Sequence, residues 1–261
     1  MLPYITITVP TYGIMVAIGA FSFISFLYYR NISDESKEIC FKHFLLLIFF
    51  CGVGCLVGSK LLYTLTQLPA LLQNFSVEQL LKMIIMSGLV FYGGLFGASL
   101  ACVIFCKIFG YSLDEILNRV APAFALFHSF GRIGCLCGGC CYGFRLSQPF
   151  QMAFGQLNYF PIQAVEAAFE FIMFIILAKM DFKKPVYRTY LTVYAVYRFI
   201  SEFLRGDEVR GIWFGLSTSQ WISLIILAWV GKNFLRQNGE RFTDICLFNH
   251  KKSKSPVERV V

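Results

Sequence analysis

Seven long runs of apolar residues, separated by short polar or charged segments, account for most of the chain. They cover residues 12–29, 43–63, 88–109, 120–137, 161–179, 188–204 and 213–235. Each is close to the 20 or so residues that an α-helix needs to cross the hydrocarbon core of a bilayer. The pattern therefore predicts an all-α polytopic membrane protein with about seven transmembrane helices.

Two of these runs have unusual features. The fourth contains Pro122, His128, Arg132 and several glycines, so we expect a broken or partial helix there. The first has no Lys or Arg before Arg30 and no Ala-x-Ala cleavage pattern after it. It therefore lacks the marks of a signal peptide and is interpreted as a retained first span.

The composition agrees with a membrane protein and narrows the organisation of the chain. Hydrophobic residues make up 57% of it and charged residues only 15%, against about 25% charged in soluble proteins. We expect one transmembrane domain over residues 1–236 and a basic cytoplasmic tail over residues 237–261. The net charge is +8, and the basic residues lie between the apolar runs and in the tail. This distribution favours anionic lipid over nucleic acid as the partner.

The basic residues lie mainly in alternate connections between the runs. Sixteen of the 23 fall in one set: Arg30, Lys37, Lys42, Lys107, Arg119, Lys179, Lys183, Lys184, Arg188, Lys232, Arg236, Arg241, Lys251, Lys252, Lys254 and Arg259. The opposite set holds only Lys82, Arg145, Arg205 and Arg210. By the positive-inside rule, the N-terminus is outside and the C-terminus is cytoplasmic.

Three basic residues remain within or at the ends of the runs: Lys60, Arg132 and Arg198. A charge in the hydrocarbon region costs at least about 2.5–3.5 kcal/mol and usually has a partner or a function. Arg198 has Glu202 four residues later on the same helical face. This pair is either structural or part of a site, whereas Lys60 is near enough to a span end to snorkel.

A glycine- and cysteine-rich turn runs from His128 to Gly143 and surrounds Arg132. Its glycines, which include Gly131, Gly134 and Gly143, permit close backbone approach. Backbone N–H groups beside an arginine suit a phosphate or another anion. Packing between helices through small residues would explain the same glycines.

The same turn holds Cys135, Cys137, Cys140 and Cys141, for which several interpretations remain open. Cys137-x-x-Cys140 is a suitable zinc-binding pair, but no second spaced pair accompanies it. A disulfide fits an oxidising outer face. The same cysteines would also serve as small packing residues, or one of them as a catalytic thiolate.

Two further clusters stand at span boundaries. Tyr92, Gly93 and Gly94 combine a hydroxyl with glycines that allow close approach, although interfacial aromatic residues are common. Pro161 begins the fifth run and is followed by Gln163 and Glu166, which share a helical face. A carboxylate near a helix start also simply favours the helix dipole.

Five motifs in this order resemble those of the bacterial prolipoprotein diacylglyceryl transferase family, over residues 10 to 235 or so. They are Tyr12-Gly13, Tyr92-Gly-Gly-Leu, Gly131-Arg-Ile-Gly through Tyr142-Gly143, Pro161-x-Gln-x-x-Glu166 and Arg198-Phe-Ile-Ser-Glu-Phe-Leu-Arg205. The chain is similar to a divergent, Cys-rich member. The resemblance implies a seven-span enzyme of the bacterial cytoplasmic membrane, with its active site toward the outer face.

The resemblance also implies the reaction and its partners. The family moves the diacylglyceryl group of phosphatidylglycerol to the lipobox cysteine thiol of a prolipoprotein and releases glycerol phosphate, with no cofactor or metal. Arg132 and Arg198 would bind the phosphate and Glu202 would orient Arg198. The further motif positions expected to contact substrate are Tyr12, Gly93, Gly94, Gly131, Gly134, Cys135, Gly143, Gln163, Glu166 and Arg205.

Two departures from the family pattern bear on the chemistry. Tyr92 replaces a histidine considered as the catalytic base, and a tyrosine hydroxyl has a pKa near 10. Cys135 replaces the family's asparagine. His128 is then a second candidate for the base, or a structural histidine. Two different functions also fit the sequence: a related phospholipid-dependent transferase or hydrolase with another acceptor, and a non-catalytic lipid-binding or transport protein.

Overall fold

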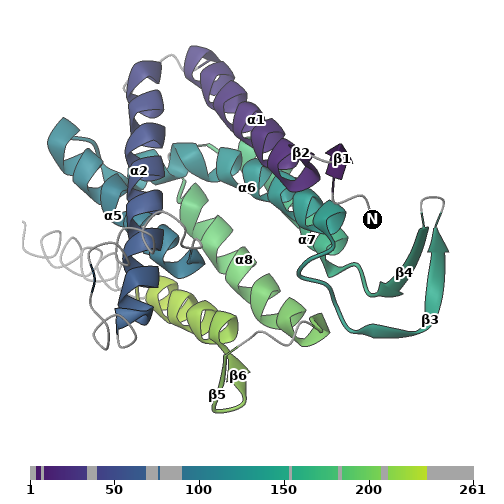
Figure 1. The fold of residues 1–261 in the computed structure, drawn as a ribbon. Coiled ribbons are helices and arrows are strands. Elements are labelled where there is room, and N and C mark those ends of the chain that lie inside the picture. The colour runs from purple at the N-terminus through teal and green to yellow at the C-terminus, as the bar shows by residue number, and fades with distance from the viewer. Residues whose placement is uncertain are drawn as a thin grey trace, which may run out of the picture.

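The computed structural model describes residues 4–6, 9–33, 40–68, 76, 90–152, 155–181, 184–206 and 211–233. Its helices are α1 (Thr11–Ser33), α2 (Phe41–Thr66), α5 (Phe91–Phe109), α6 (Leu113–Gly138), α7 (Ile162–Ala178), α8 (Val186–Ser201), the 3-10 turn η1 (Glu202–Leu204) and a last helix over residues 218–233. Its strands are β1 (Tyr4–Thr6), β2 (Val9–Pro10), β3 (Arg145–Met152), β4 (Gly155–Tyr159), β5 (Ile212–Trp213) and β6 (Leu216–Ser217). Figure 1 shows these elements. The predicted tail over residues 237–261 and Lys82 lie outside the described residues.

Every predicted span overlaps a helix, so the prediction of a mostly helical chain is confirmed. Among the described residues, three helices are long and apolar enough to cross a membrane: Thr11–Arg30, Phe41–Thr66 and Leu113–Gly138. Gly93–Phe109 is a shorter apolar helix. The number of spans and their orientation stay predictions.

The expected break in the fourth span is wrong. Helix α6 continues without interruption through Pro122, whose side chain is fully buried. A proline removes one backbone hydrogen bond, but packing against neighbouring helices lets a bundle helix tolerate the loss. The helix ends instead at Gly139, which has a φ of 71°, and the Cys140 N–H closes the end on the Cys135 carbonyl at 3.2 Å.

Helix α6 is also the centre of the bundle, in contact with α1, α7 and α8 (Figure 1). One apolar cluster joins its residues Ile116 and Ala123 to Phe105 of α5. Another joins Ala125 to Leu177 of α7 and to residues of α8. Small residues on two faces of α6 therefore bring the other helices close to the axis that carries Arg132.

Three short antiparallel hairpins, β1–β2, β3–β4 and β5–β6, supplement the helices. They were not predicted, because the segments that form them were interpreted only as connections between or ends of the apolar runs. The β3–β4 hairpin follows directly after the cysteine-rich turn and precedes α7 (Figure 1). It thereby returns the chain from the end of α6 to the start of α7.

The distribution of side chains is the reverse of that in a soluble bundle. Large apolar side chains face outward, with Phe21 74% and Phe96 73% exposed, whereas Gln163, Glu166 and Glu170 are almost completely buried. An outward apolar surface suits lipid, and buried polar groups in membrane helices generally face the bundle interior. The helices therefore enclose a group of buried polar side chains in addition to the two apolar clusters.

Glycines allow α2 and α5 to pack with their backbones in close contact. Gly54 and Gly58 of α2 face Gly93 and Gly97 of α5, each pair spaced by four residues. A Cβ at Gly54 would lie 2.5 Å from the Gly97 carbonyl oxygen. Spacing of small residues by four is a recurrent basis of close helix contact in membranes.

We predict that Gly54→Ala destabilises the protein by about 1–3 kcal/mol, because the added methyl group must push apart two backbones. The measurement is thermal unfolding of the purified protein in detergent. Gly52→Ala is the matched control on the same helix, since a Cβ there meets nothing within 4 Å. Equal effects of the two substitutions would contradict the close contact.

Candidate active site

Three helices bring four charged side chains together inside the bundle. Arg132 comes from α6, Glu166 from α7, and Arg198 and Glu202 from the end of α8 and η1. Glu166 Oε1 lies 2.9 Å from Arg132 Nη2 and 3.7 Å from Arg198 Nη1. Glu202 Oε2 lies 2.9 Å from Arg198 Nη2. The predicted Arg198–Glu202 pair is therefore one half of a larger network.

The network is buried but leaves hydrogen-bonding capacity unused. The side chains of Arg132 and Arg198 are 15% and 13% exposed, and that of Glu166 only 1%. Arg132 Nε and Arg198 Nη1 have no hydrogen-bond partner within the described part of the chain. A buried donor left unsatisfied costs about 1–3 kcal/mol, so an anion that accepts from both guanidinium groups would be stabilised here.

The Cys-rich turn lies against the same site. Gln163, on α7 one turn before Glu166, donates from Nε2 to the Cys140 carbonyl at 2.6 Å. Gly143 N–H donates to the Phe160 carbonyl at 2.9 Å, and Gly143 forms a backbone bridge with Arg205. A Cβ at Gly143 would lie 2.7 Å from the Phe160 oxygen. The turn is thus tied by its backbone to the start of α7 and the end of η1.

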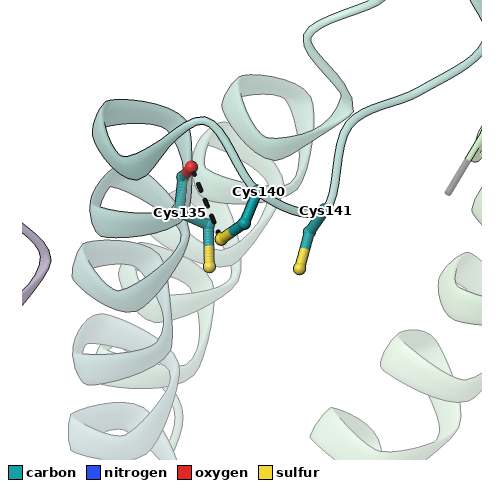
Figure 2. A group of neighbouring side chains, drawn as sticks. All are labelled: Cys135, Cys140 and Cys141. Carbon is teal, nitrogen blue, oxygen red and sulfur yellow. Dashed lines mark hydrogen bonds between the residues drawn. The ribbon is translucent and has the colours of Figure 1, made fainter. Parts of the chain in front are cut away.

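Three thiols of this turn form a compact group. The sulfur atoms of Cys135, Cys140 and Cys141 lie within 4.8 Å of one another (Figure 2). Cys137, the partner that sequence spacing suggested for Cys140, is not a member of the group. All nine described cysteines are free, so no described pair forms the disulfide considered from the sequence.

The surroundings of this group favour negative charge on one thiol. Hydrogen bonding with the Cys135 thiol, together with the charges of Arg205 and Arg132, lowers the pKa of Cys141 to about 5. Burial raises the pKa of Cys140. The guanidinium groups of the site therefore extend their effect to the turn.

His128 belongs to a second buried network one turn before Arg132 on α6. Its Nδ1 lies 2.8 Å from Glu170 Oε1, and the Tyr190 hydroxyl donates to Glu170 Oε2 at 3.1 Å. The ring of Tyr194 packs against the imidazole at 5.4 Å between centroids. These contacts fit the structural role considered for His128.

Sequence reasoning missed Glu170 and the three tyrosines that border the site on α8, Tyr190, Tyr194 and Tyr197. Glu170 is fully buried, and Tyr197 stacks on Phe169 at 3.8 Å. A signal was present, because Glu170 lies four residues after Glu166 on one face of an apolar helix. Counting buried carboxylates as well as buried cations would have found it.

The remaining predicted residues lie in three places. Tyr12 of α1 meets Gly134, where a Cβ would lie 3.0 Å from its ring, so both lie beside the Cys-rich turn. Gly93 and Gly94 pack against α2, where a Cβ on Gly94 would meet Ser59 Oγ at 2.6 Å. A Cβ at Gly131 would meet open space. The side chain of Tyr92 lies outside the described part of the structure.

Comparison with known proteins identifies the family. The family model of prolipoprotein diacylglyceryl transferase matches residues 1–232. The chain belongs to this family. The resemblance inferred from the five motifs is therefore confirmed.

Individual relatives agree along most of the chain. A phosphatidylglycerol–prolipoprotein diacylglyceryl transferase of Clostridium tetani is 31% identical over 227 residues, which cover 83% of this chain and 88% of the relative. A second enzyme of that name, from Clostridium perfringens, is 29% identical over 83% of this chain and 86% of its own length. A third, from Dehalococcoides mccartyi, is 25% identical over 92% of this chain and 94% of its own length.

We predict that Glu166→Gln destabilises this family member by about 3–5 kcal/mol, because two buried guanidinium groups then lose the carboxylate between them. Thermal unfolding in detergent measures the loss. Asp114→Asn is the control: its side chain is 56% exposed and pairs with Arg188 at 2.9 Å, so the expected cost is below about 1 kcal/mol. A Glu166→Gln protein as stable as the Asp114→Asn protein would contradict the bridging role.

Proposed function

We propose that this chain transfers the diacylglyceryl group of phosphatidylglycerol to the lipobox cysteine thiol of a prolipoprotein and releases glycerol phosphate. The observation that carries the proposal is the pair of buried guanidinium groups, Arg132 and Arg198, which both approach Glu166 and whose Nε and Nη1 atoms, respectively, make no hydrogen bond within the described part of the chain. The family and the names of its relatives agree with this activity. The substrate lipid carries a single phosphodiester charge, which such a pair of cations suits.

The reaction requires stabilisation of the leaving group. The acceptor sulfur attacks the glycerol carbon that bears the phosphate ester, a C–S bond forms, and the C–O bond breaks. The electron pair of that bond leaves with glycerol phosphate, which gains a negative charge. In this proposal Arg132 and Arg198 neutralise this charge as it develops, and Glu202, at 2.9 Å from Arg198, orients that guanidinium group.

The orientation of the polar side chains supports a site reached from the membrane. Arg198 and Arg132 are partly exposed, whereas Glu166 behind them is closed to solvent. Cys140, in the turn that Gln163 contacts, is also exposed. We infer that phosphatidylglycerol enters between the helices with its headgroup toward this turn.

We predict that Arg132→Ala and Arg198→Ala each reduce transfer by at least about 100-fold, because each removes a donor to the developing charge. The assay is incubation of purified protein with labelled phosphatidylglycerol and a lipobox peptide. Arg188→Ala is the matched control, since Arg188 pairs with Asp114 near the start of α6 and outside the network.

Each outcome of this assay has a clear meaning. Full transfer by either site variant would overturn the assignment of the two arginines. Release of glycerol phosphate without labelling of the peptide, in the unmodified protein, would favour a related enzyme with another acceptor. Membrane insertion of both variants is checked by their extraction with detergent from washed membranes.

We further propose that the chain crosses the bacterial cytoplasmic membrane seven times, with the N-terminus outside, the C-terminus inside and the site toward the outer face. The positive charges support this orientation. Arg30 at the end of α1 donates to the carbonyl of Ala178 at 2.6 Å, which joins two predicted cytoplasmic ends. Arg188 and Asp114 join the starts of α8 and α6 at the same end.

Two exposed native cysteines allow a direct test of this orientation. Cys40 precedes α2 at the predicted cytoplasmic end, and Cys140 follows α6 at the predicted outer end. The test uses variants that retain a single cysteine, either Cys40 or Cys140. In intact cells, a membrane-impermeant maleimide should label the Cys140 variant. It should label the Cys40 variant only after the membrane is permeabilised. The reverse pattern would show an inverted topology.

A further inference from the structure

The thiol group of Cys135, Cys140 and Cys141 begins one helical turn after Arg132 and is not part of the ion-pair network. Figure 2 shows Cys135 at the last turn of α6 and the other two in the loop that follows, with their side chains directed into the same region. Cys140 Sγ also lies 3.8 Å from the Cys135 carbonyl oxygen. One thiol ligand from the end of α6 and two from the turn that follows it thus lie close together.

The spacing of the sulfurs is close to that of a metal site. Their separations are within 4.8 Å, and three thiolates at about 2.3 Å from one tetrahedral zinc ion lie about 3.8 Å apart. A contraction of about 1 Å, within reach of side-chain rotation in a loop, would close the site. Thiolates select zinc or cuprous ions over harder metals.

Three ligands leave one tetrahedral position open. Zinc sites that bind four protein ligands are structural, whereas those with three keep a position for water or substrate. Cys135 is buried, Cys141 is partly exposed and Cys140 is exposed, so the group is open on one side. The group is therefore accessible from the side of Cys140.

The site's charge and position connect it to the phosphate-binding pair. A zinc ion with three thiolates carries one net negative charge, which a neighbouring guanidinium group stabilises. Cys135 follows Arg132 by three residues on one face of α6. Gln163 links the turn to α7 through the Cys140 carbonyl at 2.6 Å.

We propose that Cys135, Cys140 and Cys141 bind one zinc ion, whose fourth position takes the acceptor thiol and activates it as a thiolate. This rests on the proposed function, in which the acceptor is a thiol. The zinc ion would also replace the base that must remove the acceptor's proton. Tyr92 stands where the family has a histidine, and His128 is paired with Glu170.

The step balances without an oxidant or reductant. The acceptor thiol replaces water on the zinc ion and releases its proton to solvent, because a metal-bound thiol is deprotonated. The bound sulfur then attacks the glycerol carbon, and its bond to zinc gives way to the new C–S bond. Glycerol phosphate leaves with the electron pair of the broken C–O bond, and water returns to the metal.

The first experiment tests metal binding apart from activity. Full-length protein in nanodiscs is reduced, loaded with zinc, desalted and analysed by inductively coupled plasma mass spectrometry. We expect one zinc per chain, lost in Cys135→Ala, Cys140→Ala and Cys141→Ala but retained in the control Cys137→Ala. No retained zinc, or equal retention in all four variants, would overturn the proposal, as would a disulfide among these three cysteines in protein isolated from membranes.

The second experiment tests the open position. Cobalt replaces zinc, and a lipobox peptide is added without phosphatidylglycerol. We expect the thiolate-to-cobalt absorption to increase, as a fourth thiolate binds, but not with a peptide in which serine replaces the lipobox cysteine. An unchanged spectrum with both peptides would overturn substrate activation by the metal. This readout stands even if the chain transfers no diacylglyceryl group.

The third experiment uses the pH profile of transfer. Without the metal, the rate should follow the free acceptor thiolate and rise about tenfold per pH unit up to about pH 8.5. The zinc-loaded enzyme should show a flatter profile, and Cys141→Ala should follow the steep one. Identical pH profiles for zinc-loaded and chelated enzyme would show that transfer does not depend on the zinc site. The zinc proposal would then be wrong while the proposed transferase function stands.

Discussion

Charge buried among apolar helices must be balanced by other buried charge, and this constraint organises the interior of the protein. Glu166 lies between the guanidinium groups of Arg132 and Arg198, and Glu202 holds Arg198 from the other side. Removing charges from water costs several kcal/mol per ion even in relaxed proteins. Such a network is a weak source of stability, so its persistence in an apolar bundle indicates a function.

The position of the network depends on the continuity of α6. Because the helix runs unbroken through Pro122 to Gly138, Arg132 is held at a definite position in the bundle by the contacts of α6 with α1, α7 and α8. The left-handed residue Gly139 then stops the helix abruptly. The chain is thereby directed across the start of α7, where Gln163 contacts the turn and Glu166 contacts the arginine.

The two departures from the family pattern both bear on how the acceptor thiol loses its proton. Tyr92 removes an imidazole, while Cys135 replaces an amide and adds a thiol to those of Cys140 and Cys141. The reaction proposed for the chain is the alkylation of a thiol. A zinc ion on this cluster, as proposed above, would supply a second way to generate a thiolate, in place of proton removal by a nitrogen base.

The sequence by itself predicted the apolar helices, because apolar runs follow from local composition, and its five motifs identified the family through their resemblance to known members. It identified the Arg198–Glu202 pair because an i,i+4 contact lies within one helix. Only the tertiary structure decided that Glu166 lies between two arginines, that His128 pairs with Glu170, and that Cys140 groups with Cys135 and Cys141. These contacts join different helices or depend on where α6 ends, and the close packing that creates them is not encoded in local spacing.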